Sequence, residues 1–291
     1  MDEQMALVPK DTTEDAMITL WIKTKDSEHT RRNYRRHIDR FRSFLGKPLA
    51  QTTLFDLQAF VEHMRDEGVL NQNSQKVILD VIKSFLSYAH TSGLFKVNVG
   101  KAYGALKKVE TISERILSEY EVQSMIMNEQ DPRNHAILRV LYGGGLRVAE
   151  LCNLRWKDVI DRGDAVQVSV IGKGNKKRHV LLTPEISAAL LALGEGEDDA
   201  YVFRSKDLKS AKLTTRAVQY MVKNAAKRAG IKNWKHVSPH WLRHSHATHT
   251  ISHGAPLAVV KETLGHSNIA VTDTYIHVRP GESSARYLPK F

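Results

Sequence analysis

The spacing of apolar residues constrains the fold of this chain more than any other feature of its sequence. In the first hundred residues, apolar side chains recur three and four positions apart, which is typical of helices with one buried face. This spacing predicts helices over residues 14–23, 27–46, 54–66 and 74–91. Short polar breaks join them, so this part of the chain is predicted to be a compact helical bundle.

The second part of the chain combines helices with one alternating segment. Ser118 and Glu121 form a capping-box pattern at a helix start, and further helices are predicted over 134–142, from Arg147 onward, and over 183–193 and 214–229. Valines alternate with other residues over 166–170, a turn follows at 172–175, and a return strand is expected at 179–182. The predicted fold class is mainly α with a small antiparallel β-sheet.

The length of 291 residues suits two domains, each able to bury its own core. Residues 101–114 have little periodicity and several lysines, which is typical of a linker. The predicted organisation is a leader at 1–11, a helical domain at 12–100, this linker, a second domain at 115–278 and a tail at 279–291.

Composition indicates a cytoplasmic protein. No apolar run approaches 18 residues, so no membrane span is expected. The first sixteen residues are polar and acidic, unlike a secretory signal. The only cysteine, Cys152, excludes an internal disulfide and fits a reducing compartment.

Charge favours a polyanionic partner. The chain has 43 Lys and Arg against 32 Asp and Glu, a formal net charge of +11. Nucleic acid is the first candidate and anionic lipid the second, although a solvated basic surface would give the same count. The candidate contacts are Arg31, Arg32, Arg35 and Arg36 on helix 27–46, Lys176, Lys177 and Arg178 beside the hairpin turn, and Arg216 and Lys223 on helix 214–229.

The candidate catalytic residues gather mainly between 238 and 275. His240 and Arg243 lie three positions apart on a predicted helix and therefore on one face. His266 and Tyr275 follow at the edges of later elements. Three glycines at 143–145, which permit close approaches that a Cβ would forbid, precede Arg147 with only Leu146 between, and Lys173 occupies the predicted hairpin turn.

Metal and nucleotide sites are poorly supported. The zinc-protease pattern requires Glu directly after the first of two histidines, whereas Trp241 follows His240. His244, His246 and His249 are better interpreted as packing or hydrogen-bonding residues. The segment around Lys173 lacks the remaining elements of a phosphate-binding loop, so no metal and no cofactor are expected.

Several segments resemble one family. The segments HWLRHSHATH and LGHSN, with a tyrosine nine residues after His266, resemble the C-terminal half of the tyrosine recombinases (phage integrases, Xer-like). GGGLRVAELCNLRWKDV resembles the segment with the family's first catalytic arginine, and VIGKGNKKRHVLL resembles its lysine-bearing hairpin. The match covers about 113–278, and more weakly 12–100. One departure is Gly144, where Thr or Ser is frequent, which leaves local geometry open.

The resemblance implies a two-domain fold and metal-free attack on a DNA phosphodiester. Two guanidiniums, from Arg147 and Arg243, would neutralise the phosphate oxygens. Tyr275 would be the nucleophile, with His240 as its base, Lys173 as the acid for the leaving 5′-oxygen and His266 as a phosphate hydrogen-bond donor. Glu150 would support the segment that carries Arg147.

The resemblance also implies partners and leaves alternatives. Four subunits would act on two double-stranded DNA molecules through a Holliday junction, and whether a second recombinase takes part stays open. A type IB topoisomerase uses nearly the same residues but relaxes DNA as a monomer, and a non-catalytic DNA-binding relative is the other alternative.

Overall fold

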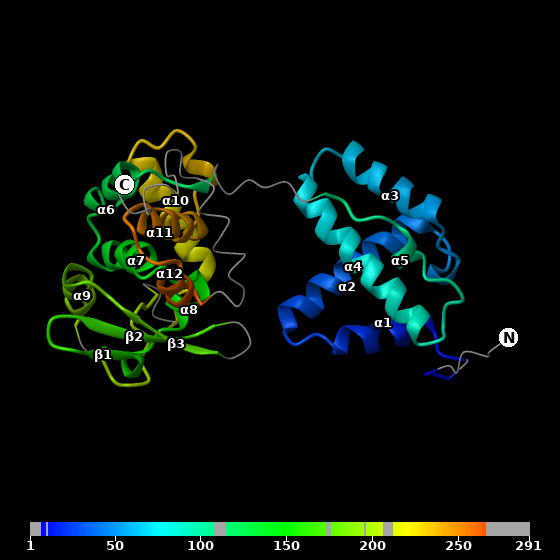
Figure 1. Cartoon of the computed structure of the whole chain (residues 1–291), viewed down its shortest axis with the longest axis horizontal. Helices are drawn as coiled ribbons and strands as arrows, with labels where there is room; N and C mark the ends of the chain where they lie inside the picture. The colour runs from blue at the N-terminus through cyan, green and yellow to red at the C-terminus, as the bar shows by residue number, and fades with distance from the viewer. Residues whose placement is uncertain are drawn as a thin grey trace, which may run out of the picture. The chain divides into compact units, whose positions relative to one another are not determined.

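The computed structural model describes residues 7–9, 11–107, 115–172, 176–194, 196–205 and 212–265. The chain divides into two compact units, Met1–Glu110 and Thr111–Phe291, called unit 1 and unit 2 below (Figure 1). Each unit has its own hydrophobic core.

Unit 1 is helical throughout its described residues, as the apolar spacing predicts. Its helices are α1 (Glu14–Lys23), α2 (Glu28–Leu45), α3 (Leu54–Asp66), α4 (Gln72–Thr91) and the short α5 (Val99–Ala102), with a 3₁₀ turn at Leu49–Gln51. The core combines aliphatic and aromatic side chains, and Trp21, Phe41, Phe60 and Phe85 are fully buried in it.

Local signals set the ends of α2. The Ser27 side chain accepts a hydrogen bond from the Thr30 amide at the start of the helix, and Gly46 ends it in the left-handed conformation, with φ 64°. Helix α5 was not predicted and contains Lys101 and Ala102 of the expected linker. It packs closely on α4. This close approach is possible because residue 100 is glycine, since a Cβ there would collide with the Lys83 carbonyl.

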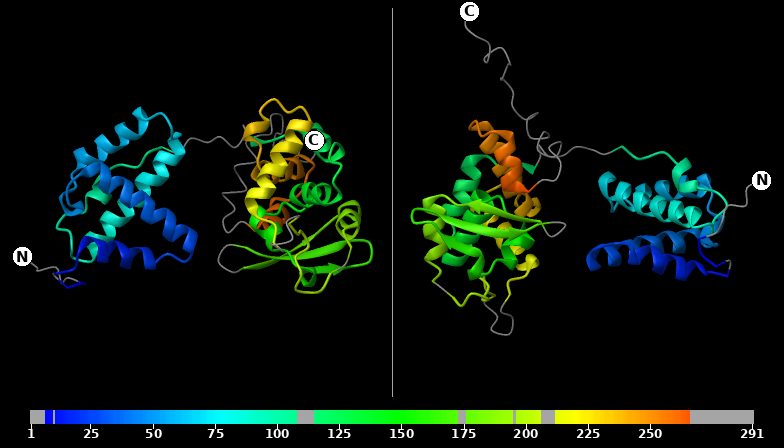
Figure 2. Two further views of the ribbon diagram at one scale, coloured as in Figure 1. Left: turned by 180° about the vertical axis from the view of Figure 1, so that it is seen from behind. Right: turned by 60° about the horizontal axis from the view of Figure 1, so that its bottom comes forward.

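Unit 2 packs its helices over a small sheet (Figure 2). The helices are α6 (Glu119–Met127), α7 (Pro132–Gly143), α8 (Val148–Asn153), α9 (Pro184–Leu191), α10 (Thr215–Arg228), α11 (Pro239–Ser252) and α12 (Leu257–Leu264), with 3₁₀ turns at Trp156–Asp158 and Trp234–His236. The predicted capping box at the start of α6 is present, since Ser118 and Glu121 exchange side-chain and backbone hydrogen bonds.

The sheet has three antiparallel strands in the order β1 (Val159–Asp161), β2 (Val166–Ile171) and β3 (Lys177–Leu181). The sequence predicted only β2 and β3, and it placed the return strand at 179–182. Strand β1 was missed because three residues are too few to show an alternating pattern. Val168 pairs with Val180 in the register, so β2 and β3 form the predicted hairpin.

Fold class is therefore confirmed as mainly α with a small antiparallel sheet. Among the described residues, no helix combines the length and apolar character that a membrane crossing requires.

Candidate active site

Arg147 lies at the N-cap of α8, where a glycine turn delivers it. Gly145 has φ +57°, and a Cβ on it would lie 2.9 Å from both His246 Cδ2 and Leu264 Cδ2. Only glycine fits this turn without strain. Gly145 is therefore a position before Arg147 where the predicted close approach occurs, against the side chains of His246 and Leu264.

Glu150 holds Arg147 from one turn along α8. Its Oε2 accepts from the Arg147 backbone N–H at 2.8 Å, and its Oε1 accepts from Arg147 Nη1 at 2.8 Å. The Glu150 carboxylate thus accepts a hydrogen bond from the N-cap amide of α8 and orients the guanidinium of Arg147.

Arg178 is the second partner of Glu150. Its Nη1 and Nη2 donate to the two carboxylate oxygens at 2.7 and 2.8 Å, and its Nε donates to the Thr263 carbonyl at 2.8 Å. The side chain of Arg178 is only 9% exposed and that of Glu150 only 4%. Burial alone would raise the Glu150 pKa, but hydrogen bonds from Arg178 and Arg147 outweigh it and hold the pKa below its usual value.

This position of Arg178 differs from the DNA contact that the sequence analysis expected. The guanidinium is occupied inside unit 2 and ties β3 to α8 and α12. A signal for this was present in the sequence: in a strand, Arg178 shares a face with Val180, and Val180 is buried.

Arg243 reaches the same place from α11. It is buried, and its guanidinium donates to the carbonyls of Gly145 and Leu264. Arg147 Nη2 donates to the next carbonyl, that of Gly265, at 3.4 Å. The two guanidiniums therefore converge on the last residues of α12, although Arg147 and Arg243 are 96 positions apart in the sequence.

Three of the six predicted catalytic residues, Lys173, His266 and Tyr275, lie outside the described residues. Two of them directly follow glycines that border the arginines. A Cβ on Gly172 would lie 3.6 Å from Arg147 Nη1, and one on Gly265 would lie 2.9 Å from Arg178 Cδ. The chain positions just before Lys173 and His266 are therefore at the arginine pair.

His240 lies one turn before Arg243 on α11, as predicted, and is exposed. Desolvation by the protein around its ring lowers the His240 pKa, and the positive charges of Arg243, Arg147 and Arg115 lower it further. The imidazole is therefore neutral near pH 7 and able to accept a proton.

Two further histidines of α11, His246 and His249, have packing and hydrogen-bonding positions. His246 is buried, which lowers its pKa to about 4. His249 Nδ1 lies 2.8 Å from the Tyr142 hydroxyl and joins α11 to α7. Among the residues the structure describes, no three His, Cys, Asp or Glu side chains form a group that could hold a metal ion.

The remaining predicted DNA contacts are surface cations, some with partners. On α2, Arg31 Nε donates to the Lys25 carbonyl at 2.7 Å, and Arg32 and Arg35 pair with Glu28 and Asp39 one turn away. Arg36, Arg216, Lys176 and Lys177 are exposed, and Lys223 is half-buried.

Comparisons with known proteins identify the family of this chain. Residues 114–282 match the phage integrase family, and residues 17–93 match the phage integrase N-terminal SAM-like domain. The chain is 35% identical to the tyrosine recombinase XerC of Xylella fastidiosa, with 91% of each chain covered. It is 32% identical to XerA of Thermococcus kodakarensis, with 97% of this chain and 98% of that one covered.

Solved structures show the same fold. A XerA recombinase matches with a TM-score of 0.51 and 26% identity over 94% of this chain and 98% of that chain. A lambda integrase dimer bound to a COC′ core site matches with a TM-score of 0.74 and 20% identity over 92% and 98%. With both family domains matched and tyrosine recombinases at 32% and 35% identity over more than nine-tenths of its length, this chain belongs to the phage integrase family and is a tyrosine recombinase.

Proposed function

We propose that this tyrosine recombinase cleaves and rejoins DNA at specific sites through a 3′-phosphotyrosyl bond to Tyr275. Strand exchange between two duplexes would then proceed through a Holliday junction. The observation that carries this mechanism is the convergence of Arg147 and Arg243 on the carbonyls of Leu264 and Gly265, directly before His266.

The arginine pair is suited to a phosphate. Guanidiniums keep their charge at any working pH, and their planar forks match the geometry of phosphate oxygens. Arg243 donates to two backbone carbonyls, and the single carboxylate of Glu150 is shared between two guanidiniums, those of Arg147 and Arg178. The site therefore retains net positive charge where the transition state develops negative charge.

Proton transfers divide among the remaining residues. The Tyr275 hydroxyl, with an ordinary pKa of about 10, has to lose its proton, and the neutral His240 is the base that we assign to it. His266 is assigned a hydrogen bond to the scissile phosphate. Lys173 is assigned the proton for the departing 5′-oxygen. The 5′-hydroxyl of a partner strand then attacks the phosphotyrosine and reverses the bond, so no ATP is consumed.

The proposed partners are double-stranded DNA and three further copies of this chain, with a second recombinase as a possible member. Support comes from a structural relative described as a lambda integrase tetramer bound to a Holliday junction. Arg31, Arg32, Arg35 and Arg36, together with Lys176, Lys177, Arg216 and Lys223, stay proposed backbone contacts. The proposed location is the cytoplasm.

A covalent-trapping experiment tests the mechanism. A duplex site is first selected for binding from a random library, and a nick near the cleavage point then traps any adduct on denaturing gels. Wild type should form the adduct, also in excess EDTA, and Tyr275→Phe should bind the duplex and form none. Tyr287→Phe is the matched control and should react like wild type.

The same substrates separate the alternatives. Transfer of the trapped strand to the 5′-hydroxyl of a second duplex identifies a recombinase, whereas relaxation of supercoiled DNA without such transfer identifies a type IB topoisomerase. Binding with no adduct in wild type would identify a non-catalytic relative. An adduct that persists in Tyr275→Phe would move the nucleophile to another tyrosine.

A further inference from the structure

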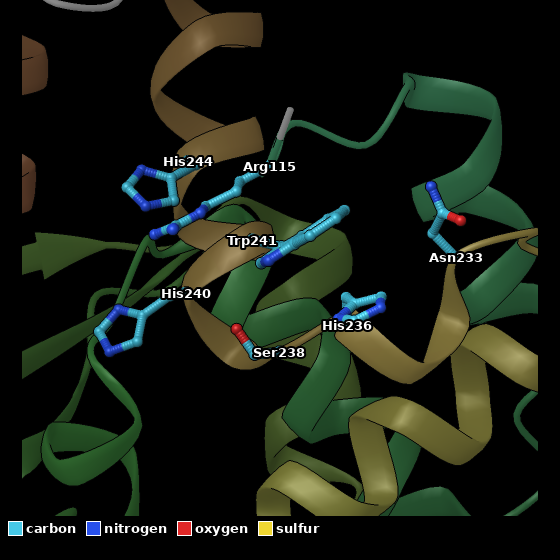
Figure 3. A pocket seen from close by; sticks show the side chains of 7 residues that line it. All are labelled: Arg115, Asn233, His236, Ser238, His240, Trp241 and His244. Atoms are coloured by element: carbon cyan, nitrogen blue, oxygen red, sulfur yellow. The ribbon is translucent and has the colours of Figure 1, made fainter. Parts of the chain in front are cut away.

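A pocket of about 680 Å³ lies beside His240 in unit 2. Three segments build it: Arg115 at the start of the described part of unit 2, the loop that precedes α11, and the first two turns of α11 (Figure 3). The residues that matter here are Arg115, His236, Ser238, His240, Trp241 and His244. None of the catalytic roles assigned above uses Arg115, His236 or His244.

The lining of this pocket suits an anion. Among the described residues, its lining contains one arginine and three histidines and no carboxylate. Within the described part of the chain, Arg115 forms no salt bridge with Asp or Glu, and its side chain is directed between His244 and His240 (Figure 3). Burial lowers the pKa of both rings, and the charge of Arg115 is among the smaller causes that lower it further.

His240 and His244 add hydrogen-bond donors to the pocket without adding positive charge. Burial lowers the His244 pKa to about 4, with His240, Arg115 and Arg243 contributing, so the ring is neutral near pH 7. A neutral imidazole carries one N–H donor. Trp241 contributes an indole N–H, which can only donate, and Ser238 contributes a hydroxyl. A group with several acceptor oxygens and one negative charge, such as a phosphodiester, matches this set.

The position of the pocket indicates which phosphate it takes. His240 belongs to both the pocket and the arginine site, since it precedes Arg243 by one turn of α11. A strand whose scissile phosphate is bound by Arg147 and Arg243 continues past His240. The volume falls within the range of about 300–1,000 Å³ typical of ligand sites, so a phosphate with part of its nucleotide fits.

We propose that this pocket binds a phosphate of the cleaved strand next to the scissile one, with Arg115 as its main contact. The inference rests on the proposed function, because the scissile phosphate defines the strand. The Arg115 contact holds the strand in register at the nucleophile, in addition to the contacts made by the two catalytic arginines.

Neutral-phosphate substitution tests this contact. Single methylphosphonates are placed at the first and second phosphates on each side of the scissile one, in the nicked duplex used for trapping. Single-turnover adduct formation and duplex affinity are measured for wild type, Arg115→Ala, Arg115→Lys and the control Arg162→Ala. Arg162 is an exposed cation at the β1–β2 turn, at the opposite end of β2 from the hairpin turn.

Arg115→Ala should lower the rate or affinity on normal DNA by about tenfold, the typical effect of one charged hydrogen bond. One methylphosphonate should cause the same loss in wild type and no further loss in Arg115→Ala. Arg115→Lys should recover part of the loss, and Arg162→Ala should respond like wild type at all four positions.

If the loss from Arg115→Ala and the loss from the methylphosphonate multiply at all four positions, the proposal is overturned, because Arg115 would then contact none of these phosphates. A loss of folded protein in Arg115→Ala, seen as a lowered melting temperature that Arg115→Lys does not restore, would also overturn it. If wild type forms no adduct with any selected duplex, the proposed function itself fails, and that outcome is separate from a selective failure at Arg115.

Discussion

The two units use arginine in opposite ways. In unit 1, the arginines of α2 lie on the surface, and the Arg32–Glu28 pair has side chains that are 75% and 84% exposed. In unit 2, Arg243 is buried and donates to backbone carbonyls, and the Arg178 side chain is only 9% exposed and is fixed by Glu150 and the Thr263 carbonyl. A dense row of arginines is therefore a poor guide to where an anion is held in fixed geometry.

The physical reason is the cost of removing charge from water. An exposed pair gains little, because solvent screens it and both side chains lose freedom. A buried charge requires compensating partners or it destabilises the fold. Arg178, Arg147 and Glu150 meet this requirement together, so the position of each guanidinium is set by the fold and not by solvent.

The largest effect is expected for Glu150→Ala. Arg178 would then keep its charge in a buried site without its carboxylate, and breaking a buried pair costs about 3–5 kcal/mol of unfolding free energy. Urea titration followed by tryptophan fluorescence measures this, because Trp156, Trp234 and Trp241 lie in unit 2 and Trp21 alone in unit 1.

Two comparisons sharpen this result. Glu28→Ala, which breaks an exposed pair on α2, should cost no more than about 0.5 kcal/mol by circular dichroism; equal losses at Glu28 and Glu150 would remove the contrast between the units. The pH dependence of stability gives a second comparison. The Glu150 pKa is lower in the folded protein than in the unfolded chain, so the ionised carboxylate stabilises the fold fully above the unfolded pKa of about 4.3, and this stabilisation is lost as the pH falls through the lower folded value. The difference in unfolding free energy between wild type and Glu150→Ala should therefore become smaller only below about pH 4.

The next effect is on cleavage rate. Arg147→Ala and Arg243→Ala should each slow adduct formation by about 10²–10³, because each removes a donor to the charge that develops on the phosphate. A substrate with sulfur in place of the bridging 5′-oxygen should not rescue either variant, since the arginines do not act on the leaving group. Circular dichroism checks that both variants are folded.

Lys173→Ala provides the contrast on the same two substrates. It should be slow on normal DNA and largely restored on the sulfur substrate, because a thiolate leaves without an acid. If sulfur failed to restore the rate, Lys173 would be a DNA contact, and His240 or Lys176 would become the candidate acid.

A smaller effect is expected from α2. Arg36→Ala should weaken duplex binding and reduce the slope of log affinity against log salt by about 0.9, the value for one phosphate contact. Arg35→Ala should change affinity less. Arg35 already donates to the Asp39 carboxylate at 3.0 Å, so binding a DNA phosphate would require it to give up that carboxylate. Fluorescence anisotropy across a salt series measures both slopes; an unchanged slope in each variant would place DNA elsewhere.

The smallest effect is a shift in titration. In the free protein, His240 and His244 should titrate below the ordinary midpoint of about 6.5, with His244 near 4. Proton NMR of the histidine rings, assigned with His240→Gln and His244→Asn, gives the midpoints. Removing one positive neighbour, in Arg115→Ala, should raise both, and a His244 midpoint of 6.5 or above would contradict the burial of its ring.

Much of the fold could be predicted because its signals are local. The ends of α2 follow from Ser27 and Gly46, and the start of α6 follows from Ser118 and Glu121. Strand β1 could not be predicted, since its three residues are held by pairing with β2 and not by a pattern of their own. Family motifs identified Arg147 and Arg243 as candidates before any geometry was known.

The sequence by itself determined most of the helices, the hairpin, the basic charge and the identity of the candidate catalytic side chains. Tertiary structure decided which partner fixes each arginine of the site. Arg178 meets Glu150 across 28 positions, and Arg243 meets the Gly145 carbonyl across 98. Helix and strand patterns report neighbours within about four residues, so they cannot show which distant carboxylate or carbonyl accepts a guanidinium. That choice depends on how α8, α11, α12 and β3 pack around one glutamate.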